Sequence, residues 1–396
     1  MWRLLRERNF FLFWSGQGFS EVGTWINFVG LNAYLYHVHN SGRLLALFLI
    51  FRLLPSILFG TIGGVLADRY DRRKIMILCD LIRCVLVLFF LFAHDLVTFF
   101  VLGFLLSSLD KIFGAALGAY LPNLVEKNRL MEANALRRMT SSVVTVIGPA
   151  LAGLLIGLSG YNVVFLVDSG SFLVSVLTLL FLRPASTQAP PAGKSPGILK
   201  DLKGAYLFMA GKSALIILSL VRMVDALGSG AYNTILPVFA KAFSFSMGSF
   251  YGFLIAAWGL GCFAGSLMAG RIKADEIRRR RIFFSAVSLM AIGMLGCFNS
   301  PGWLGALLYI GLGGIGDGIS SVIFLSVIME ESPEEMRGKI FGTMNAFLHL
   351  AVGLGMLLSS FVIGSVPVGR IAAAGSLFII VGGLAAWQGM ARKGMV

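Results

Sequence analysis

About twelve apolar runs follow one another along the 396 residues, and each is close to the length of a membrane-crossing helix. A helix needs roughly 20 apolar residues to cross the hydrocarbon core of a bilayer. Only 13% of the residues are charged, against about 25% in a typical soluble domain. Strands of a membrane β-barrel alternate apolar and polar residues over short segments, unlike these runs. The sequence therefore predicts an all-α polytopic membrane protein.

The expected spans are 10–36, 44–66, 75–93, 97–121, 137–158, 161–182, 214–240, 248–270, 281–299, 303–329, 339–363 and 370–391. Met1–Arg8 is basic, but the apolar run after it is long and lacks a small-residue cleavage site. It is therefore interpreted as the first span rather than as a signal peptide.

A polar segment divides the spans six and six. Residues 183–213 begin with a stretch rich in proline and glycine, which predicts a flexible or extended linker. Ile198–Phe208 has the pattern of a short amphipathic helix lying on the cytoplasmic face. The predicted organisation is an N-terminal six-helix bundle (1–182), a cytoplasmic linker (183–213) and a C-terminal six-helix bundle (214–396) with pseudo-symmetry between the bundles.

The net charge of +14 is explained by topology. Lysine and arginine concentrate at both termini, in alternate loops and in the linker, whereas the opposite loops hold Arg43, Lys241 and Arg370. Because basic loops stay on the cytoplasmic side, both termini are expected in the cytoplasm. This distribution argues against nucleic-acid binding.

A short charged turn, Gly63–Lys74, lies between the second and third spans. A glycine such as Gly64 allows two helix ends to approach closely. Asp68 is suited to accept hydrogen bonds from free amides at a helix start, and arginines form forked bonds to carboxylates. The basic residues of the turn are Arg69, Arg72, Arg73 and Lys74. Contacts of this kind can form and break, which suits a gate.

The letters of this turn, G-x-L-A-D-R-x-x-R-R-K, resemble the cytoplasmic signature loop of the major facilitator superfamily. The usual pattern has glycine where Asp71 stands. The variant D-R-Y-D-R-R-K is similar to the branch that holds macrolide efflux proteins and the enterobactin exporter. The resemblance implies a transporter whose two bundles surround a central cavity and rock between inward-facing and outward-facing states.

Four acids occupy matching places in the two halves. Glu21 and Asp225 lie about 11 residues into the first span of each half, and Asp110 and Asp317 lie about 13 to 14 residues into the fourth. An ionisable group inside a bilayer costs roughly 2.5–3.5 kcal/mol, so each is a functional candidate. The resemblance implies that these spans line the cavity. A carboxyl balanced there between burial and a facing cation is suited to load and release a proton.

Other polar residues in the spans complete the candidate site. Arg222 lies three residues before Asp225, and Arg52 and Lys111 are further cations for proton coupling or substrate binding. The side chain of Asn27 is expected to contribute a polar group to the wall of the cavity. Asp80 and Arg83, three residues apart on one helix, are interpreted as a structural ion pair.

Two places depart from the antiporters of the superfamily. Many carry an arginine on the fourth span where Asp110 stands here, with Lys111 beside it. On the fifth span, Gly148, Pro149 and Gly153 resemble the antiporter signature G-P-x-x-G-G, with alanine for one glycine. A proline bends the helix, and small residues permit close packing. Together with the charged turn, this motif favours an exporter.

The predicted function is proton-coupled export (antiport) of amphipathic small molecules such as drugs or siderophores, by a monomer in the bacterial inner membrane. The proton gradient is the driving force, with no cofactor or metal. No G-x-x-x-x-G-K-[ST] loop is present, so direct ATP use is not expected. Nor is there a catalytic constellation such as H-E-x-x-H, so an enzyme is not expected.

Three alternatives remain open at this stage. The chain is also consistent with a facilitator-type carrier of lipids or lysolipids, with an uptake permease, or with a scaffold that keeps the transporter fold without transport. Flux direction separates the first two from export, and partner binding independent of solute is the mark of the third.

Overall fold

The computed structural model describes residues 4–126, 129–182, 207–208, 211–241, 243, 247–272 and 275–391. Over these residues the chain is helical, with one isolated β-bridge between Ile363 and Val366. Most of the predicted linker, including nearly all of Ile198–Phe208, lies outside the described residues.

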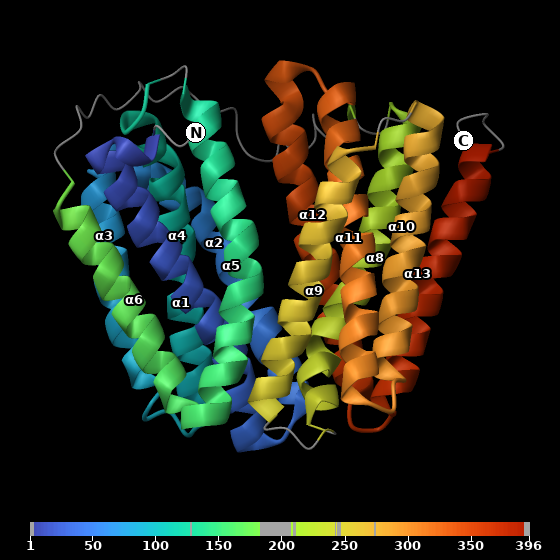
Figure 1. Cartoon of the computed structure of the whole chain (residues 1–396), viewed down its shortest axis with the longest axis horizontal. Coiled ribbons are helices and arrows are strands. Elements are labelled where there is room, and N and C mark those ends of the chain that lie inside the picture. Colours follow the sequence, from blue (N-terminus) through green and yellow to red (C-terminus); the bar gives the residue numbers. More distant parts are fainter. Residues whose placement is uncertain are drawn as a thin grey trace. The chain divides into compact units, whose positions relative to one another are not determined.

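The described residues form twelve α-helices of 18 to 32 residues. Figure 1 shows how they are labelled along the chain. They are α1 (Arg8–His39), α2 (Gly42–Arg69), α3 (Arg72–Phe89), α4 (Leu96–Tyr120), α5 (Leu130–Ser159), α6 (Asn162–Leu180), α8 (Ser213–Ala240), α9 (Met247–Gly270), α10 (Glu276–Phe298), α11 (Trp303–Glu331), α12 (Glu334–Val362) and α13 (Val368–Ala391). Each overlaps one predicted span, so the predicted fold class is confirmed.

Nine of these helices, α4 to α6 and α8 to α13, are long and apolar enough to cross a membrane by length and composition. The short helix α3 is too highly charged to meet the same criterion, with Arg72, Arg73, Lys74, Asp80 and Arg83 among its 18 residues. Three of these charged residues, Arg72, Asp80 and Arg83, are buried, whereas Lys74 in the first turn is exposed.

The described residues group into two compact units. Unit 1 comprises Met1–Asn40, Phe48–Gly193 and Ser244–Ala256, and unit 2 comprises Ser41–Leu47, Lys194–Phe243 and Ala257–Val396. The first turn of α2 thus belongs with unit 2, and the first part of α9 with unit 1. The predicted boundaries at 182 and 214 stay a prediction.

In unit 1, α1 packs against α5 and α6, and α3 packs against α4 and α6. Gly16, Gly23 and Gly30 lie seven residues apart on the face of α1 that meets α6. A Cβ atom at these positions would collide with Thr178, Ser171 and Val164, respectively. Because small residues let backbones approach, this row of glycines brings α1 and its acid close to the other helices of the unit.

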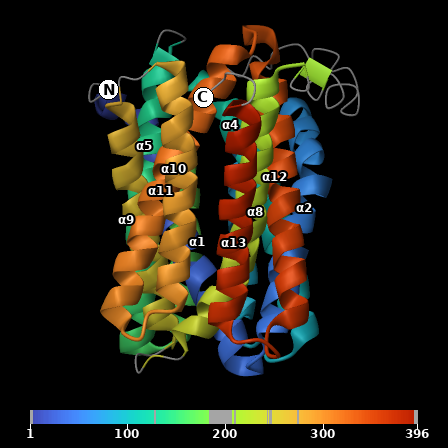
Figure 2. The same cartoon turned by 90° about the vertical axis from the view of Figure 1, so that its right-hand side faces the viewer.

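In unit 2, α8 packs against α12 and α13, and α10 packs against α11 and α13, an arrangement visible in Figure 2. Helices α8 and α12 approach each other closely at Gly230 and Gly355. A Cβ at Gly230 would collide with the carbonyl of Val352, and one at Gly355 with the carbonyl of Leu227. Close packing of this kind holds α8, which carries Arg222 and Asp225, in a fixed position.

Candidate functional site

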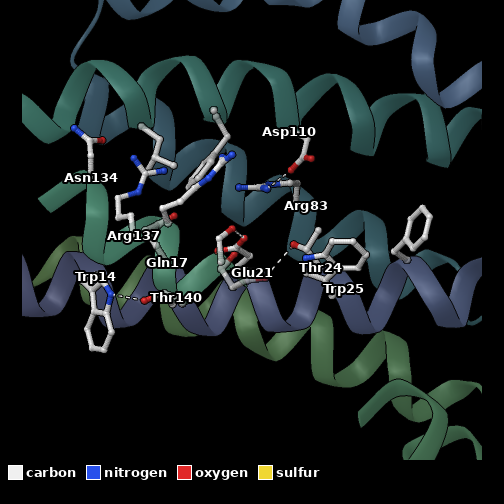
Figure 3. Close-up of a pocket in the computed structure, with 18 of the residues that line it drawn as sticks. Trp14, Gln17, Glu21, Thr24, Trp25, Arg83, Asp110, Asn134, Arg137 and Thr140 are labelled. Carbon is white, nitrogen blue, oxygen red and sulfur yellow. Dashed lines mark hydrogen bonds and ion pairs between the residues drawn. The ribbon is translucent and has the colours of Figure 1, made fainter. Parts of the chain in front are cut away.

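A cavity of about 660 Å³ lies within unit 1 and is lined by side chains from α1 to α5. Its walls combine aromatic rings with charged and polar groups, as Figure 3 shows. The aromatic lining is Trp14, Trp25, Phe28 and Phe113; the charged lining is Glu21, Arg52, Arg83, Asp110, Arg137 and Arg138; the polar lining includes Gln17, Thr24, Asn134, Thr140 and Ser141. Aromatic walls with a few polar groups are typical of sites for small organic molecules.

Helix α1 contributes one face to this cavity. Gln17, Glu21 and Thr24 follow one another at the spacing of helical turns and line the same wall. At one end of that wall, Trp14 Nε1 donates a hydrogen bond of 2.8 Å to Thr140 Oγ1 on α5. This contact ties α1 to α5 where the cavity is lined by both helices.

Glu21 lies in this wall with its carboxylate engaged by α5. Ser141 Oγ donates a hydrogen bond to Glu21 Oε1. The guanidinium of Arg137, one turn before Ser141, interacts electrostatically with the same carboxylate, and both side chains line the cavity in Figure 3. The predicted acid therefore lies at the cavity surface, beside a hydroxyl donor and a cation that the sequence did not connect to it.

Asp110 on α4 lines the same cavity and is paired with Arg83 on α3. Arg83 Nη1 lies 2.7 Å from Asp110 Oδ1, and Arg83 Nη2 binds Asp80 Oδ1 on its own helix. Asp80 is fully buried, whereas 46% of the Asp110 side chain is exposed. The guanidinium also lies 4.1 Å from the ring centroid of Phe113. The Asp80–Arg83 pair predicted from spacing is confirmed, and Asp110 is the additional partner.

Arg52 on α2 connects the cavity to a second, smaller one of about 20 Å³. The smaller cavity reaches Asn27 and Asp168. Asn27 Nδ2 donates a hydrogen bond of 2.7 Å to Asp168 Oδ2 in the buried interior of the unit. A cavity of this size holds about one water. Lys111, the neighbour of Asp110, is not among the described residues that line either cavity.

In unit 2 the remaining predicted residues form one cluster. Arg222 Nη1 lies 2.5 Å from Asp225 Oδ2 and 3.2 Å from Asp317 Oδ1. The same guanidinium donates to Ser320 Oγ at 3.2 Å and to Ser321 Oγ at 3.1 Å. The side chain of Asp225 is 3% exposed and that of Asp317 is 20% exposed. One arginine thus serves two carboxylates.

The structure therefore brings the four predicted acids together in pairs. Glu21 and Asp110 line one cavity in unit 1, and Asp225 and Asp317 bind one arginine in unit 2. The pairs differ in their partners. In unit 1, Glu21 interacts with Arg137 and Asp110 shares Arg83 with Asp80, whereas the two acids of unit 2 share Arg222.

Three cations and one acid of the cavity region were not predicted as site residues. From the sequence, Arg83 is interpreted as part of a structural pair, and no role is predicted for Arg137 or Arg138. Arg137 lies four residues before Ser141, so the two side chains lie on the same face of α5 and both reach Glu21. This spacing in the sequence could have linked the two residues to one site. Asp168 lies on α6 behind the cavity. The spacing of residues along one helix cannot predict its contact with Asn27, because Asn27 lies on a different helix, α1.

The charged turn joins the ends of several helices of unit 1. Arg72 Nε donates to the carbonyl of Ala67 at 3.0 Å, and its Nη1 donates to the carbonyl of Ala119 at the end of α4, also at 3.0 Å. Arg73 donates to the carbonyls of Leu179 and Leu180 at the end of α6, at 2.7 and 2.8 Å. These bonds satisfy carbonyls that a helix end leaves free.

Other residues of the turn are less enclosed. Gly64 has open space where a Cβ would stand, and Arg69 is exposed. The side chain of Asp68 lies outside the described residues. The proposed contact of Asp68 with the arginines therefore stays a prediction.

Asp71, which stands where the superfamily pattern has glycine, is the N-cap of α3. Its carboxylate accepts hydrogen bonds from the backbone amides of Arg73 at 2.9 Å and Lys74 at 3.2 Å. These bonds explain why α3 begins directly after a two-residue turn.

Replacing Asp71 by alanine removes these two acceptors. An Asp71→Ala variant is expected to lose about 1 kcal/mol of stability, the usual cost of a lost N-cap. The measurement is the thermal unfolding of the purified protein in detergent. Asp71→Asn keeps a capping oxygen and serves as the control. An equal loss in both variants would show that the cap does not set the stability.

The antiporter-like motif on α5 makes two close approaches within unit 1. Pro149 lies inside α5. A Cβ at Gly148 would stand 2.5 Å from the Cβ of Trp25, and one at Gly153 would stand 2.6 Å from the carbonyl oxygen of Ser249 in the first part of α9. From the other side, a Cβ at Gly252 would stand 2.5 Å from the carbonyl oxygen of Pro149. The small residues of the motif therefore act through helix packing at these points.

Among the described residues, no group of three or more His, Cys, Asp or Glu is placed to hold a metal ion. The charged groups of the cavity and of the unit 2 cluster instead pair arginines with carboxylates. Such groups suit proton binding and the recognition of charged organic molecules.

Solved structures share this fold. The nucleoside transporter NupG aligns with a TM-score of 0.73 at 14% identity, over 96% of this chain and 98% of that one. A bacterial homologue of the iron transporter ferroportin, in an inward-facing state, aligns with a TM-score of 0.73 at 14% identity, over 97% and 98%. At this identity the likeness concerns the twelve-helix fold.

The sequence relatives are named as a transporter and an exporter. The chain is 26% identical to the uncharacterized MFS-type transporter YfiS of Bacillus subtilis, over 86% of this chain and 84% of the relative. It is 28% identical to the enterobactin exporter EntS of Escherichia coli, over 81% of this chain and 77% of the relative. Residues 1–387 match the family described as transmembrane secretion effectors. The chain therefore belongs to this family of major facilitator superfamily transporters, as a multi-pass membrane protein.

Proposed function

We propose that this transporter is a secondary active exporter that moves amphipathic small molecules out of the cell by alternating access, driven by proton entry. The observation that carries the proposal is the cavity of about 660 Å³ in unit 1, where aromatic rings and intramembrane charges line the same space. Charged residues at membrane depth are costly and mark substrate or ion pathways.

Glu21 is the carboxyl group proposed to carry the proton, with Asp110, which lines the same cavity, as the second candidate. Glu21 accepts a hydrogen bond from Ser141 and faces the cation of Arg137, while Asp110 is held by Arg83. A proton on either carboxyl weakens its attraction to its arginine. Protonation thereby changes the charge that a bound molecule meets, and this links proton entry to release.

The unit 2 cluster supplies a second group of candidates for the proton. Asp225 and Asp317 share the single positive charge of Arg222, so the three groups together carry one negative charge when both acids are ionised. Neutralising one carboxylate leaves the other paired. Asp317 is the more exposed of the two and is the better placed to exchange a proton.

The substrate class follows from the relatives by analogy. EntS relatives at 28% identity are named as enterobactin exporters, so siderophores and drugs of amphipathic character are the proposed cargo. The proposed setting is the bacterial inner membrane, with both termini in the cytoplasm and the chain acting as a monomer.

Asp68, Arg72 and Arg73 are proposed to latch the cytoplasmic side in the outward-facing state. The bonds of Arg72 and Arg73 to the ends of α4 and α6 fit this role, because they link this turn to helices that line or flank the cavity.

An Asp68→Asn variant is expected to insert and fold normally but to transport at least about fivefold more slowly, because an amide loses the charge-assisted bonds of the latch. Initial rates in vesicles measure this loss. Asp71→Asn, a change of charge in the same turn, is the matched control. Normal transport by Asp68→Asn would refute the latch.

The function is tested with the purified full chain in liposomes under an imposed pH gradient, screened against cationic, anionic and neutral amphiphiles. We expect the gradient to drive accumulation of at least one class, and a protonophore to abolish it. Inside-out vesicles give the direction, which separates export from uptake. Failure of every class to move with the gradient would contradict the proposal.

A further inference from the structure

Arg52 is a cation of the cavity that the described carboxylates leave without an ion pair. Its Nε donates a hydrogen bond of 3.2 Å to Ser107 Oγ. The guanidinium lies 5.9 Å from the ring centroid of Phe28 and 5.7 Å from that of Phe48. Among the described residues, Nη1 of Arg52 is buried and has no hydrogen-bond partner. An unpaired donor at this depth is costly unless a ligand engages it.

The other arginines of the cavity are engaged differently. Arg83 is held by Asp80 and Asp110, and Arg137 faces Glu21. Asp110, on the cavity wall, and Asp168, which Asn27 binds behind it, interact with Arg52 electrostatically but form no ion pair with it. Arg52 thus presents to this cavity a buried donor, Nη1, that has no hydrogen-bond partner among the described residues.

The charges on the cavity wall are uneven. Among the described residues that line it there are four arginines (Arg52, Arg83, Arg137 and Arg138) and two carboxylates (Glu21 and Asp110). The balancing acids Asp80 and Asp168 lie buried behind this wall. A molecule inside the main cavity thus meets more positive than negative groups at close range.

The position of Arg52 also suits a particular shape of ligand. It lines both the large cavity and the small one, at the boundary between an aromatic wall and a polar recess. The half-buried rings of Trp25 and Phe28 offer apolar surface to a ring, while the free donor of Arg52 offers a charge-assisted bond to an anionic group at its edge.

We propose that the unit 1 cavity takes small aromatic anions and that Arg52 binds their anionic group. The chemistry recognised is a carboxylate or phenolate attached to an aromatic body. The inference rests on the proposed function for the idea that the bound molecule is cargo, but it is tested by binding, without a gradient.

The probes are three compounds that share one ring system and differ in charge: naphthalene-2-carboxylate, naphthalene-2-carboxamide and naphthalen-2-ylmethylammonium. Binding is measured by tryptophan fluorescence and calorimetry on the full chain in phosphatidylcholine nanodiscs, where no anionic lipid competes. The carboxylate is expected to bind at least about tenfold more tightly than the amide or the ammonium compound. Repeating the titration with phosphatidylglycerol in the disc shows whether a lipid headgroup occupies the same site.

Arg52→Gln is expected to weaken carboxylate binding by about tenfold or more and to leave amide binding unchanged, because glutamine retains a donor for Ser107 but no charge. Arg52→Lys keeps the charge without the forked donors and should lose less. Arg370→Gln removes an exposed charge of unit 2 and is the control, with unchanged binding expected.

Each of four results would overturn the inference: equal affinity for the three probes, preference for the ammonium compound, absence of binding by all three, or an unchanged carboxylate affinity in Arg52→Gln. Competition by phosphatidylglycerol with loss of the carboxylate preference would also overturn it, since the site would then serve lipid. If the pH gradient drives transport of a cationic amphiphile instead, the proposed export function still holds, and only the assignment of Arg52 as a binding site for aromatic anions is wrong.

Discussion

Replacing Arg222 by glutamine is expected to lower the stability of the protein by about 3–5 kcal/mol, the typical cost of removing one partner of a buried ion pair. The side chain of Asp225 is 3% exposed, and Arg222 lies 2.5 Å from its carboxylate. Without the arginine this carboxylate stays inside the membrane-spanning unit with no described cation in contact. Asp317, Ser320 and Ser321 lose a donor as well.

The measurement is the thermal unfolding of purified protein in detergent, together with the yield of monodisperse protein. The double variant Arg222→Gln/Asp225→Asn is the matched control, because it removes both charges and should recover most of the loss. If the single variant unfolds at the wild-type temperature, or if the double variant is no better than the single one, the cluster does not stabilise unit 2 through this pairing.

The second large effect is expected at Glu21. A Glu21→Gln variant should lose at least about tenfold in transport driven by a pH gradient, because coupling between two sites is typically worth about 5- to 150-fold. Glutamine keeps an oxygen that accepts the bond from Ser141 and preserves the side-chain length. What it removes is the charge facing Arg137 and the ability to take a proton.

Initial rates with and without the gradient distinguish a loss of coupling from a loss of binding. Glu21→Asp retains a carboxyl and should keep part of the gradient dependence. Glu126→Gln changes an exposed acid outside the cavity and should transport like the wild type. Full gradient-driven transport by Glu21→Gln would assign the proton to another carboxyl, with Asp110 and Asp317 as the next to test.

Much of the fold could be predicted, because each span carries its own signal. Long apolar runs specify helices whatever lies next to them, and the described residues form twelve α-helices, each of which overlaps one of the predicted spans. The pairing of Asp80 with Arg83 was also predictable, since residues three apart on a helix are neighbours. The same holds for Arg222 and Asp225.

The contacts between side chains on different helices were harder to predict from the sequence. Arg83 reaches Asp110 on α4, Ser141 reaches Glu21 on α1, and Asn27 reaches Asp168 on α6. Each joins residues far apart in the chain, and periodicity says nothing of which helices meet. Asp71 was a different case. The family pattern indicated only that Asp71 stands where a glycine is usual. Its role as the N-cap of α3 follows from the hydrogen bonds that its carboxylate accepts from nearby backbone amides.

The central claim is that a proton gradient drives an organic molecule through the charged cavity of unit 1. The most direct test records the flux of naphthalene-2-carboxylate and the flux of protons together in the same proteoliposomes, for the wild type and Glu21→Gln. The account predicts that the carboxylate and protons move in opposite directions in the wild type and that this exchange is lost in the variant. Carboxylate movement without proton movement in the wild type, or equal exchange in both proteins, would contradict it.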